Sequence, residues 1–553
     1  MNRRFSCNFV TTRLSMSVEE LRVVKYKRFD TVCSNNKMLL LAFCRLGLIS
    51  IVLLISGWPV EGAAQMGHGR HDLGVVNFPV SCSPQAQSAF NHAVALLHHM
   101  TYPQAREAFQ HVEAIDSHCA MAYWGEAMTL FQPLWPTRPG PAALQQGWTA
   151  VEKAKALQPP AQREQMFIAA AEAFFLDPTS KDYWLRIQRW EEAMQKVYAA
   201  YPDDPEAGAF YALAHLATTP SDRITRDHAD RAAEILLRIY RKNPNHPGAM
   251  HYLVHANDVP GRERELMEIT RKYDRVAPDN PHALHMPTHI YTRVGDWNGV
   301  ISGNLRAADA ALRYPAGDRG QFVWDEFCHA IEYLVYAYLQ KGDNRAAAAQ
   351  IKRLRTTQRL EPSFKTAFHL MSTQARYTLE RRAWKEAAAL VPREPSTLDW
   401  DRFTWPEAVV RFARGLGAAH LGRLDQAKSE RVRLNELEAA TVQMHEDLFA
   451  RNIRMLRLEL EGWIAHVEGK EDLAVSLMRE AADLEESTPK APVTPGPTLP
   501  AEELLGDLFM ERKQPAKALP AYQRSLELYP HRRHSVLGAA RAAALTRDVA
   551  VAN

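Results

Sequence analysis

Apolar and small residues recur at regular intervals between polar residues in the C-terminal segment 499–531. Their order is Leu505-Gly506, Phe509, Ala518, Tyr522, Ser525 and Pro530. This spacing predicts two antiparallel helices, because small residues let paired helices approach closely and larger apolar residues fill the space to the next pair. Pro530 is expected to end the second helix, since proline disrupts a helix interior.

The same pattern recurs less completely towards the N-terminus. It is present at Gly462, Ala474, Met478 and Ala481, at Gly415 and Ala427, at Tyr338 and Ala347, and at Ala93, Ala105 and Phe109. A period of ~34 residues with small and aromatic residues in these places is typical of the tetratricopeptide repeat (TPR). Several copies in register favour stacked hairpins, because neighbouring repeats must bury each other's faces. We predict an all-α fold, a TPR-like right-handed solenoid of antiparallel helix hairpins.

Segments rich in Pro, Asp and Asn at 201–205, 243–248 and 277–281 should each end one helix and start another. On this basis the chain divides into a presequence 1–64, a segment 65–85 leading into the fold, TPR-like repeats 86–487, a Pro-rich linker 488–500 and a C-terminal repeat 501–545. A loop rich in Pro and aromatic residues interrupts the repeats at 133–141. Its Trp135 would either line a binding groove or belong to a spacer.

The presequence has the layout of a targeting signal. An apolar run at 46–58 follows Arg45, and small residues precede Gln65. This favours a cleaved secretory signal and a periplasmic or otherwise exported protein. The alternative is an inner-membrane anchor over 38–58, although Arg45 inside that span makes membrane insertion costly. A membrane partner is expected only if this segment is retained.

The cysteines of the mature part are consistent with export. Cys82 precedes the first repeat helix and Cys119 begins the second hairpin, so the two could form a disulfide in an oxidising compartment. Two separate buried thiols are the alternative. Cys328 is then left over, and its neighbour His329 suggests a nucleophile, although a lone Cys in a helix is more often a small core residue.

The body of the chain resembles a family of exported bacterial TPR proteins that largely lacks assigned chemistry. The resembling segments begin at Phe78 (Phe-Pro-Val-Ser-Cys-Ser-Pro), Cys119 (Cys-Ala-Met-Ala-Tyr-Trp-Gly), His246 (His-Pro-Gly-Ala-Met-His-Tyr-Leu-Val-His), His282 (His-Ala-Leu-His-Met-Pro-Thr-His-Ile) and Val493 (Val-Thr-Pro-Gly-Pro). The resemblance covers about residues 70–545 and implies a helical-repeat fold and export. It implies no catalytic residues.

Charge and motifs exclude several functions. The net charge is +3 over 553 residues, and the basic excess lies in the presequence, so no nucleic-acid partner is expected. The sequence has no phosphate-binding Gly-rich loop, no dinucleotide fingerprint and no Gly-x-Ser-x-Gly elbow. Nucleotide-driven chemistry is therefore not expected.

Histidines concentrate in the middle of the chain. They are His215, His251, His255, His282, His285, His289 and His329. Each group follows a loop by a few residues and should lie on the first helix of a hairpin, which lines the concave wall of a solenoid. The earlier helix with His92, His98, His99, His111 and His118 has its core face elsewhere, so most of these side chains are expected in solvent or at hairpin seams.

The spacing of the central histidines suggests a metal site. His251 and His255 share a helix face, and His285 and His289 repeat that spacing around Pro287, which should disturb or start a helix. A third imidazole from a neighbouring helix would complete a three-His site for Zn or Cu with an open position. Asp258 or Glu332 would then orient a ligand or act as a base. The alternative is that each ring packs in the core and bonds nearby backbone.

The sequence is compatible with three functions. The first is a scaffold that binds a peptide, protein or small ligand in its concave groove through His251, His255, His285, His289 and Tyr252. The second is a metal-dependent, hydrolytic enzyme that uses the same histidines. The third is a structural hub in which the rings are separated and serve only packing. No cofactor is certain, and a divalent metal is expected only in the enzyme.

Overall fold

The computed structural model describes residues 72–552 except 137, 178, 180, 181, 225 and 318, and side chains up to 547. The presequence and its expected cleavage site lie outside the described residues. Within this part, no helix is both long enough and apolar enough to cross a membrane.

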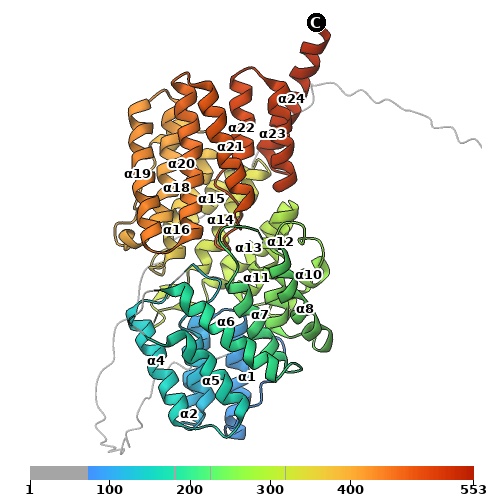
Figure 1. Cartoon of the computed structure of the whole chain (residues 1–553), viewed down its shortest axis with the longest axis vertical. Helices are drawn as coiled ribbons and strands as arrows, with labels where there is room; N and C mark the ends of the chain where they lie inside the picture. Colours follow the sequence, from blue (N-terminus) through green and yellow to red (C-terminus); the bar gives the residue numbers. More distant parts are fainter. Residues whose placement is uncertain are drawn as a thin grey trace, which may run out of the picture. The chain divides into compact units, whose positions relative to one another are not determined.

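The described chain is almost entirely helical (Figure 1). The first half contains α1 (Pro84–His98), α2 (Tyr102–Ile115), α3 (Ala120–Met128), α4 (Pro141–Ala156), α5 (Gln162–Phe175), α6 (Tyr183–Ala200), α7 (Pro205–Ala217), α8 (Arg226–Lys242), α9 (Pro247–Asn257), α10 (Met267–Val276), α11 (Pro281–His285), α12 (Pro287–Val294) and α13 (Trp297–Ala311). A short antiparallel pair, β1 (Pro315–Ala316) and β2 (Phe322–Val323), follows, with Pro315 opposite Val323.

The second half begins after this hairpin. It contains α14 (Glu326–Gln340), α15 (Asn344–Thr356), α16 (Phe364–Leu379), α17 (Trp384–Ala388), the 3-10 turn η1 (Trp400–Arg402), α18 (Thr404–His420), α19 (Leu424–Gln443), α20 (Asp447–Val467), α21 (Glu471–Ser487), α22 (Ala501–Glu511), α23 (Pro515–Leu528) and α24 (Arg533–Ala552). Successive helices contact one another as hairpins, such as α18 with α19 and α20 with α21. The all-α hairpin fold predicted from the sequence is confirmed.

Local sequence explains where many helices begin and end. Proline occupies the first turn of α1, α2, α4, α7, α9 and α11, where its missing N–H costs nothing. Asp204 and Asp343 accept backbone N–H groups at the starts of α7 and α15. Gly295 ends α12 in the left-handed region at φ 70°, which glycine adopts without steric cost.

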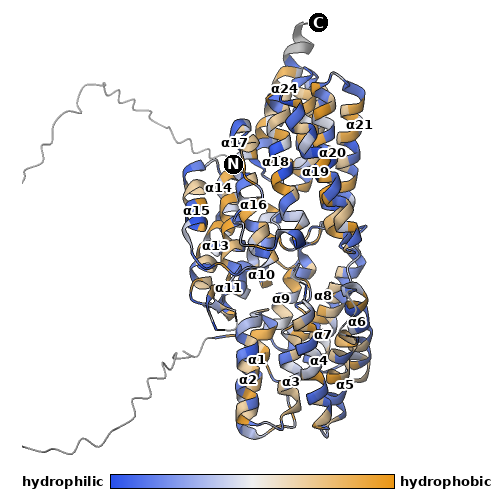
Figure 2. Ribbon diagram, turned by 90° about the vertical axis from the view of Figure 1, so that its left-hand side faces the viewer, coloured by the Kyte–Doolittle hydropathy of each residue, from blue (hydrophilic) through white to orange (hydrophobic). Residues whose placement is uncertain are grey.

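Glycine allows the helices of a hairpin to approach closely. A Cβ at Gly506 of α22 would lie 2.7 Å from the Tyr522 ring of α23. Most helices in Figure 2 carry both hydrophobic and hydrophilic residues, as expected for helices with one buried face. The small positions of the repeat pattern are therefore contact points between helices.

Two features position the central histidines. The α11–α12 pair is one hairpin arm broken at Pro287, with Met286 between the two pieces still in helical conformation (φ −53°, ψ −40°). In addition, α1 contacts α9, although the two are far apart in sequence. The histidine-bearing helices are also joined to one another, because α12 contacts both α9 and α11, and α11 contacts α14.

Candidate metal centre

Four helix segments supply six histidines to one buried region. His251 and His255 lie on α9, His282 and His285 on α11, His289 on α12 and His329 on α14. They form two groups, which we call triad A (His251, His255, His282) and triad B (His285, His289, His329). In each triad, one nitrogen from every ring lies within 4.8 Å of the others.

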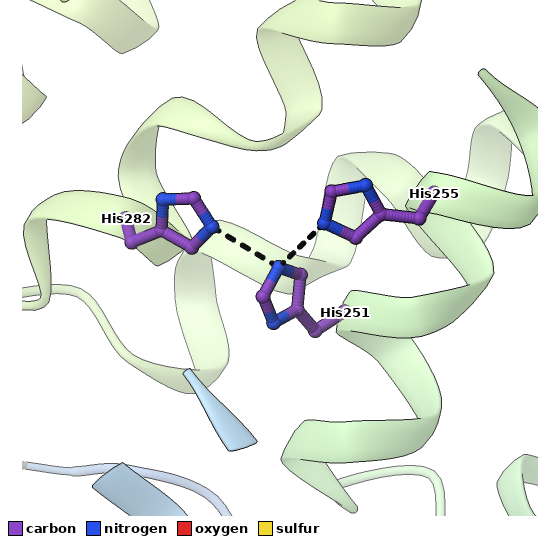
Figure 3. Close-up of side chains that lie close together, drawn as sticks. All are labelled: His251, His255 and His282. Atoms are coloured by element: carbon purple, nitrogen blue, oxygen red, sulfur yellow. Dashed lines mark hydrogen bonds between the residues drawn. The ribbon is translucent and has the colours of Figure 1, made fainter. Parts of the chain in front are cut away.

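Triad A is centred on His251 (Figure 3). Its Nε2 atom lies 3.2 Å from His255 Nε2 and 3.1 Å from His282 Nε2. His251 is fully buried and His282 is nearly so, whereas His255 is half-buried. Three imidazole nitrogens therefore converge on one point, which is the geometry a three-His metal site requires.

Triad B repeats this arrangement in the next helix pair. His285 Nε2 lies 2.9 Å from His289 Nε2, and His329 supplies the third nitrogen. All three side chains are buried. The spacing of four residues on α9 is thus matched across the break at Pro287, because the chain remains helical through that break.

The protonation of triad A follows from what the other ring nitrogens contact. His251 Nδ1 donates to the backbone oxygen of His98 at 2.6 Å, because a carbonyl oxygen can only accept. His282 Nδ1 lies 3.0 Å from a carboxylate oxygen of Glu326. A neutral ring with its proton on Nδ1 has a lone pair on Nε2. His251 and His282 therefore direct two lone pairs at each other.

The same reasoning applies to triad B. His285 Nδ1 lies 2.6 Å from Asn304 Oδ1. This oxygen is the acceptor, since the Asn304 amide nitrogen donates to the Thr288 hydroxyl and the Val300 backbone oxygen. His289 Nδ1 lies 2.9 Å from Asp258 Oδ2. The Nε2 atoms of His285 and His289 are thus both acceptors, 2.9 Å apart.

His329 is oriented through a second histidine. His369 Nδ1 lies 2.5 Å from Glu332 Oε2, so His369 Nε2 is free to accept. His329 Nδ1 lies 3.0 Å from that nitrogen and donates to it. The remaining nitrogen of His329, Nε2, then carries a lone pair. Glu332, His369 and His329 form one chain of hydrogen bonds.

Two facing lone pairs repel each other unless a cation lies between them. Ligand nitrogens at 2.0–2.1 Å from a metal are separated by about 3.3 Å in a tetrahedral site and about 2.9 Å in an octahedral one. The observed Nε2 separations span 2.9–3.2 Å. The pairs His251–His282 and His285–His289 therefore have the spacing and the lone-pair direction of ligands around an ion, and the third nitrogen of each triad lies within 4.8 Å of them.

Burial keeps these rings neutral. It lowers the pKa of His251, His285 and His329 well below the usual range, and neighbouring histidines lower each further. Burial and the Lys490 ammonium lower the pKa of His289 to about 4, although Asp258 opposes the shift. Neutral imidazole is the form that binds a metal.

The carboxylates behind the triads are all paired with cations. Burial opposes ionisation of Asp258, but Lys490 and Arg293 bring its pKa well below the usual range. Glu326 is likewise buried, and Lys365 at 2.8 Å lowers its pKa well below the usual range. These groups orient the imidazoles and compensate one another's charge.

A small cavity of about 20 Å³ lies between the two triads. It is lined by His255 and His282 of triad A, His289 and His329 of triad B, and Leu134, Trp135, Pro136, Met286, Lys365, Pro492 and Val493. A volume of this size holds one water or a diatomic molecule. A larger pocket of about 170 Å³ shares Trp135, His255, Pro492 and Val493 with it and leads outwards.

Two Pro-rich segments line this cavity: the 133–141 loop, which the sequence allows as a groove wall or a spacer, and the 488–500 linker. Trp135, from the 133–141 loop, is buried; its ring centre lies 5.6 Å from that of His282, and the Lys365 ammonium lies 3.6 Å from its ring centre. The 488–500 segment brings Lys490 to 2.7 Å from Asp258. The sequence offers no signal for this contact, because Lys490 and Asp258 are more than two hundred residues apart.

Hydrogen bonds hold the centre of the 488–500 segment in place. The Arg376 guanidinium donates to the Thr494 hydroxyl at 2.9 Å and to the Pro497 backbone oxygen at 2.7 Å. Its Nε donates to Glu332, the carboxylate that orients His369. The segment over the cavity is therefore linked to the hydrogen bonds behind triad B.

A third cluster shows what a hydrogen-bonded histidine group looks like in this protein. His98 Nε2 lies 2.7 Å and His246 Nε2 3.2 Å from the two oxygens of Glu206. His98 Nδ1 contacts the Tyr252 hydroxyl at 3.0 Å, and His246 Nδ1 accepts the Ala249 N–H. Donors meet acceptors throughout, so this cluster needs no ion.

His98 and His99 correct an expectation from the sequence. Both side chains are fully buried, not in solvent, because α1 packs against α9. His99 Nδ1 contacts the Tyr273 hydroxyl at 2.8 Å. Periodicity within α1 alone cannot show this second buried face, which depends on a distant helix.

The remaining candidate residues lie apart from the triads. His215 is half-buried on α7, 3.3 Å from Glu191, and its ring stacks on His228 with centres 3.8 Å apart. Tyr252 lies on α9 and is fully buried, with its hydroxyl 3.0 Å from His98 Nδ1. Neither contributes to triad A or triad B.

The cysteines are arranged as a bonded pair and a single thiol. Cys82 and Cys119 are joined by a disulfide. Cys328 is buried, and this burial raises the pKa of its thiol well above the usual range. A thiol held protonated is a poor nucleophile, so the proximity of His329 in sequence does not activate it.

No protein-family model and no curated protein matches the sequence. Solved structures that align with it belong to TPR-containing proteins. A chain of the APC/C hetero-tetramer Cut9–Hcn1 has a TM-score of 0.37 and 13% identity over 83% of this chain and 76% of that one. The human IFIT1 dimer with m7Gppp-AAAA gives 0.34 and 12% over 73% and 87%. Yeast Tom70 gives 0.31 and 8% over 83% and 88%. The assignment of the fold as TPR-like rests on the hairpins themselves.

Proposed function

We propose that this TPR-like protein is a metal-dependent enzyme whose centre is formed by triads A and B, with one ion in each. The proposal is supported above all by one observation: the Nε2 lone pairs of His251 and His282, and those of His285 and His289, face each other at 3.1 and 2.9 Å. Each opposite nitrogen is occupied by an acceptor, so protonating the rings cannot relieve this repulsion without charging a buried ring.

The surroundings favour catalysis over storage. Three protein ligands leave a coordination position open, and a cavity large enough for one small molecule adjoins both triads. The pocket beyond Trp135 gives a small substrate access to His255, the half-buried ligand. An ion in either triad would supply Lewis acidity or electron transfer. The protein's own residues orient the rings and limit access of water.

The same observations disfavour two other functions. A purely structural role predicts separated rings that bond local backbone, whereas these rings converge on two points. A peptide-binding groove built on the histidines requires exposed side chains, and five of the six are buried. We also propose export to an oxidising compartment, which is supported by the Cys82–Cys119 disulfide.

Elemental analysis of protein purified without added metal tests this function. We expect two ions per chain in the wild type and the loss of at least one in the His251→Ala, His282→Ala double variant. His215→Ala is the matched control, because His215 lies on the neighbouring helix α7 outside both triads and should leave the metal content unchanged.

Circular dichroism of all three proteins separates metal loss from unfolding. If the double variant fails to fold, His255→Ala serves instead, since this half-buried side chain is the member of triad A least involved in core packing. Only traces of metal in the wild type, or metal that is retained when triad ligands are removed, would show the proposed function to be wrong.

A further inference from the structure

We propose that the two ions are copper and that dioxygen binds between them and oxidises a one-ring diphenol held in the adjoining pocket. This inference rests on the proposed function, because it requires both triads to hold metal. It goes beyond that function by naming the metal, the co-substrate and the class of substrate.

The two triads are close enough to act as one centre. The ring centres of His282 and His285 are 6.2 Å apart, and those of His255 and His289 are 6.3 Å apart. His282 and His285 also lie on the same short helix, α11. The cavity between the triads contacts rings from both, so one small molecule there would reach both ions.

The ligand set favours copper over harder metals. Each triad consists of imidazoles alone, with the carboxylates Asp258, Glu326 and Glu332 placed behind the rings. Imidazole suits Cu, Zn, Fe and Ni, whereas Mg, Ca and Mn prefer carboxylate and water oxygens. Two neutral three-His sets thus disfavour the harder ions and leave copper, zinc, iron and nickel, of which copper alone is commonly monovalent in proteins.

Charge balance separates copper from zinc. The pair Glu326 and Asp325 shares Lys365, which leaves one negative charge in excess. Asp258 is paired with both Lys490 and Arg293, which leaves one positive charge. Glu332 is neutralised by Arg376.

The shell behind the six neutral rings therefore carries no net charge. Two divalent ions would add four positive charges to this buried site, and two Cu(I) ions would add half as many. Because uncompensated charge in a protein interior is costly, reduced copper is the pair of ions that fits with the smallest penalty. A site that binds Cu(I) can release an electron to form Cu(II). The donor set therefore favours a centre that cycles between these two oxidation states.

The two cavities match the two reactants in size. The space of about 20 Å³ between the triads holds a diatomic molecule, and its walls include the apolar groups Leu134, Met286 and Val493. The outer pocket of about 170 Å³ is close to the 150 Å³ that accommodates benzene in an engineered protein cavity. Aromatic walls from Trp135 and Tyr183 suit a planar ring.

The reaction balances without a further reductant. Each o-diphenol loses two electrons and two protons as its two O–H bonds break and two C=O bonds form. Dioxygen takes four electrons and four protons as its O–O bond breaks, giving two waters. Two diphenols and one dioxygen thus yield two o-quinones and two waters, and the copper ions return to the reduced state.

The test uses the mature chain loaded with copper and catechol as the probe. We expect two copper ions per chain, no paramagnetic resonance signal from the oxidised protein because the paired Cu(II) spins couple, and one dioxygen consumed for two catechols. His289→Gln should keep one copper with a visible Cu(II) signal and lower catechol oxidation by about 100-fold or more. His215→Ala should match the wild type.

A variant in the outer pocket tests the substrate class separately. Ala217 of α7 lines this pocket and belongs to neither triad. Ala217→Phe should fill the space, keep two copper ions and lower kcat/KM for catechol about tenfold.

Stoichiometric zinc with no copper uptake would overturn the inference while leaving the proposed function intact. Two copper ions without catechol-dependent dioxygen uptake would overturn the substrate class, and absence of metal would overturn both proposals.

Discussion

Whether a buried histidine is suited to bind a metal or only to pack depends on the hydrogen-bond partner of its second ring nitrogen. His246 and His251 lie near the same helix start, and both are buried. His246 accepts a backbone N–H on one nitrogen and reaches Glu206 with the other, so its hydrogen bonds are complete. His251 donates to a carbonyl with one nitrogen, and its other nitrogen faces the lone pair of His282 Nε2. Sequence spacing cannot distinguish the two cases.

Asn304 should control metal affinity without touching the ion. Its amide oxygen holds the Nδ1 proton of His285, and its amide nitrogen is held by Thr288. Asn304→Leu removes this acceptor and should weaken metal binding by about 10- to 100-fold, measured by competition with a chelator. Asn298→Leu, an exposed position on the same helix α13, is the control and should have no effect. Equal affinities in the two variants would contradict the assigned role.

Glu407 should give the protein a pH-dependent stability unrelated to metal. Burial opposes its ionisation, but Arg433 and Arg393, at 3.0 and 2.8 Å, lower its pKa to about 2. A carboxyl whose pKa falls on folding stabilises the protein above its unfolded pKa of about 4.5, and this contribution is lost as the pH falls towards 2.

Glu407→Gln should therefore lower the free energy of unfolding by about 2 kcal/mol at pH 7, a figure reduced to allow for the partly exposed arginines. The difference from the wild type should shrink below pH 4.5 in urea unfolding experiments. Glu436→Gln removes a more exposed partner of Arg433 and should change the stability little. A difference for Glu407→Gln that is constant from pH 7 to pH 3 would contradict the linkage.

At the scale of elements, the 488–500 segment has a role in the structure that its composition does not predict. Its five prolines predict a stiff connection, and it does connect α21 to α22. Packing places part of it against the cavity between the two histidine triads, and its Ala491, Val493 and Leu499 are almost fully buried. Composition predicts the stiffness of a segment, whereas its position depends on its contacts with residues that are distant in sequence.

Arg376 on α16 should hold this segment in place. Arg376→Met removes the hydrogen bonds to Thr494 and Pro497 and leaves Glu332 without its cation. Amide hydrogen exchange within 490–499 should then become at least tenfold faster, because opening the segment no longer breaks charge-assisted bonds. Arg381→Met loses a partly exposed pair with Glu386 and a contact with the Tyr377 ring, neither of which involves the 488–500 segment, and should leave this exchange unchanged. Unchanged protection in Arg376→Met would show that other contacts secure the segment.

At the scale of the whole chain, the disulfide connects the segment before α1 to the start of α3. Cys82 and Cys119 are separated by 37 residues. Closing a loop of this length should stabilise the folded state by about 3 to 4 kcal/mol through the entropy of the unfolded chain. The Cys82→Ser, Cys119→Ser double variant should show this loss in denaturant unfolding, and reductant should bring the wild type to the same value.

Cys328→Ala serves as the control for a thiol that is not part of the bond. A double variant as stable as the oxidised wild type would contradict the prediction.

The sequence by itself determined the hairpins, because their spacing of small and aromatic residues acts between neighbouring helices, and it identified the six histidines as a group. It could not determine which nitrogen of each ring carries the proton, since that depends on Asn304, Asp258, Glu326 and the His98 carbonyl, which are brought in from other helices. Nor could it place Trp135 and the 488–500 segment over them. Local periodicity sets the elements, whereas the direction of lone pairs and the shape of a cavity are products of contacts between distant parts of the chain.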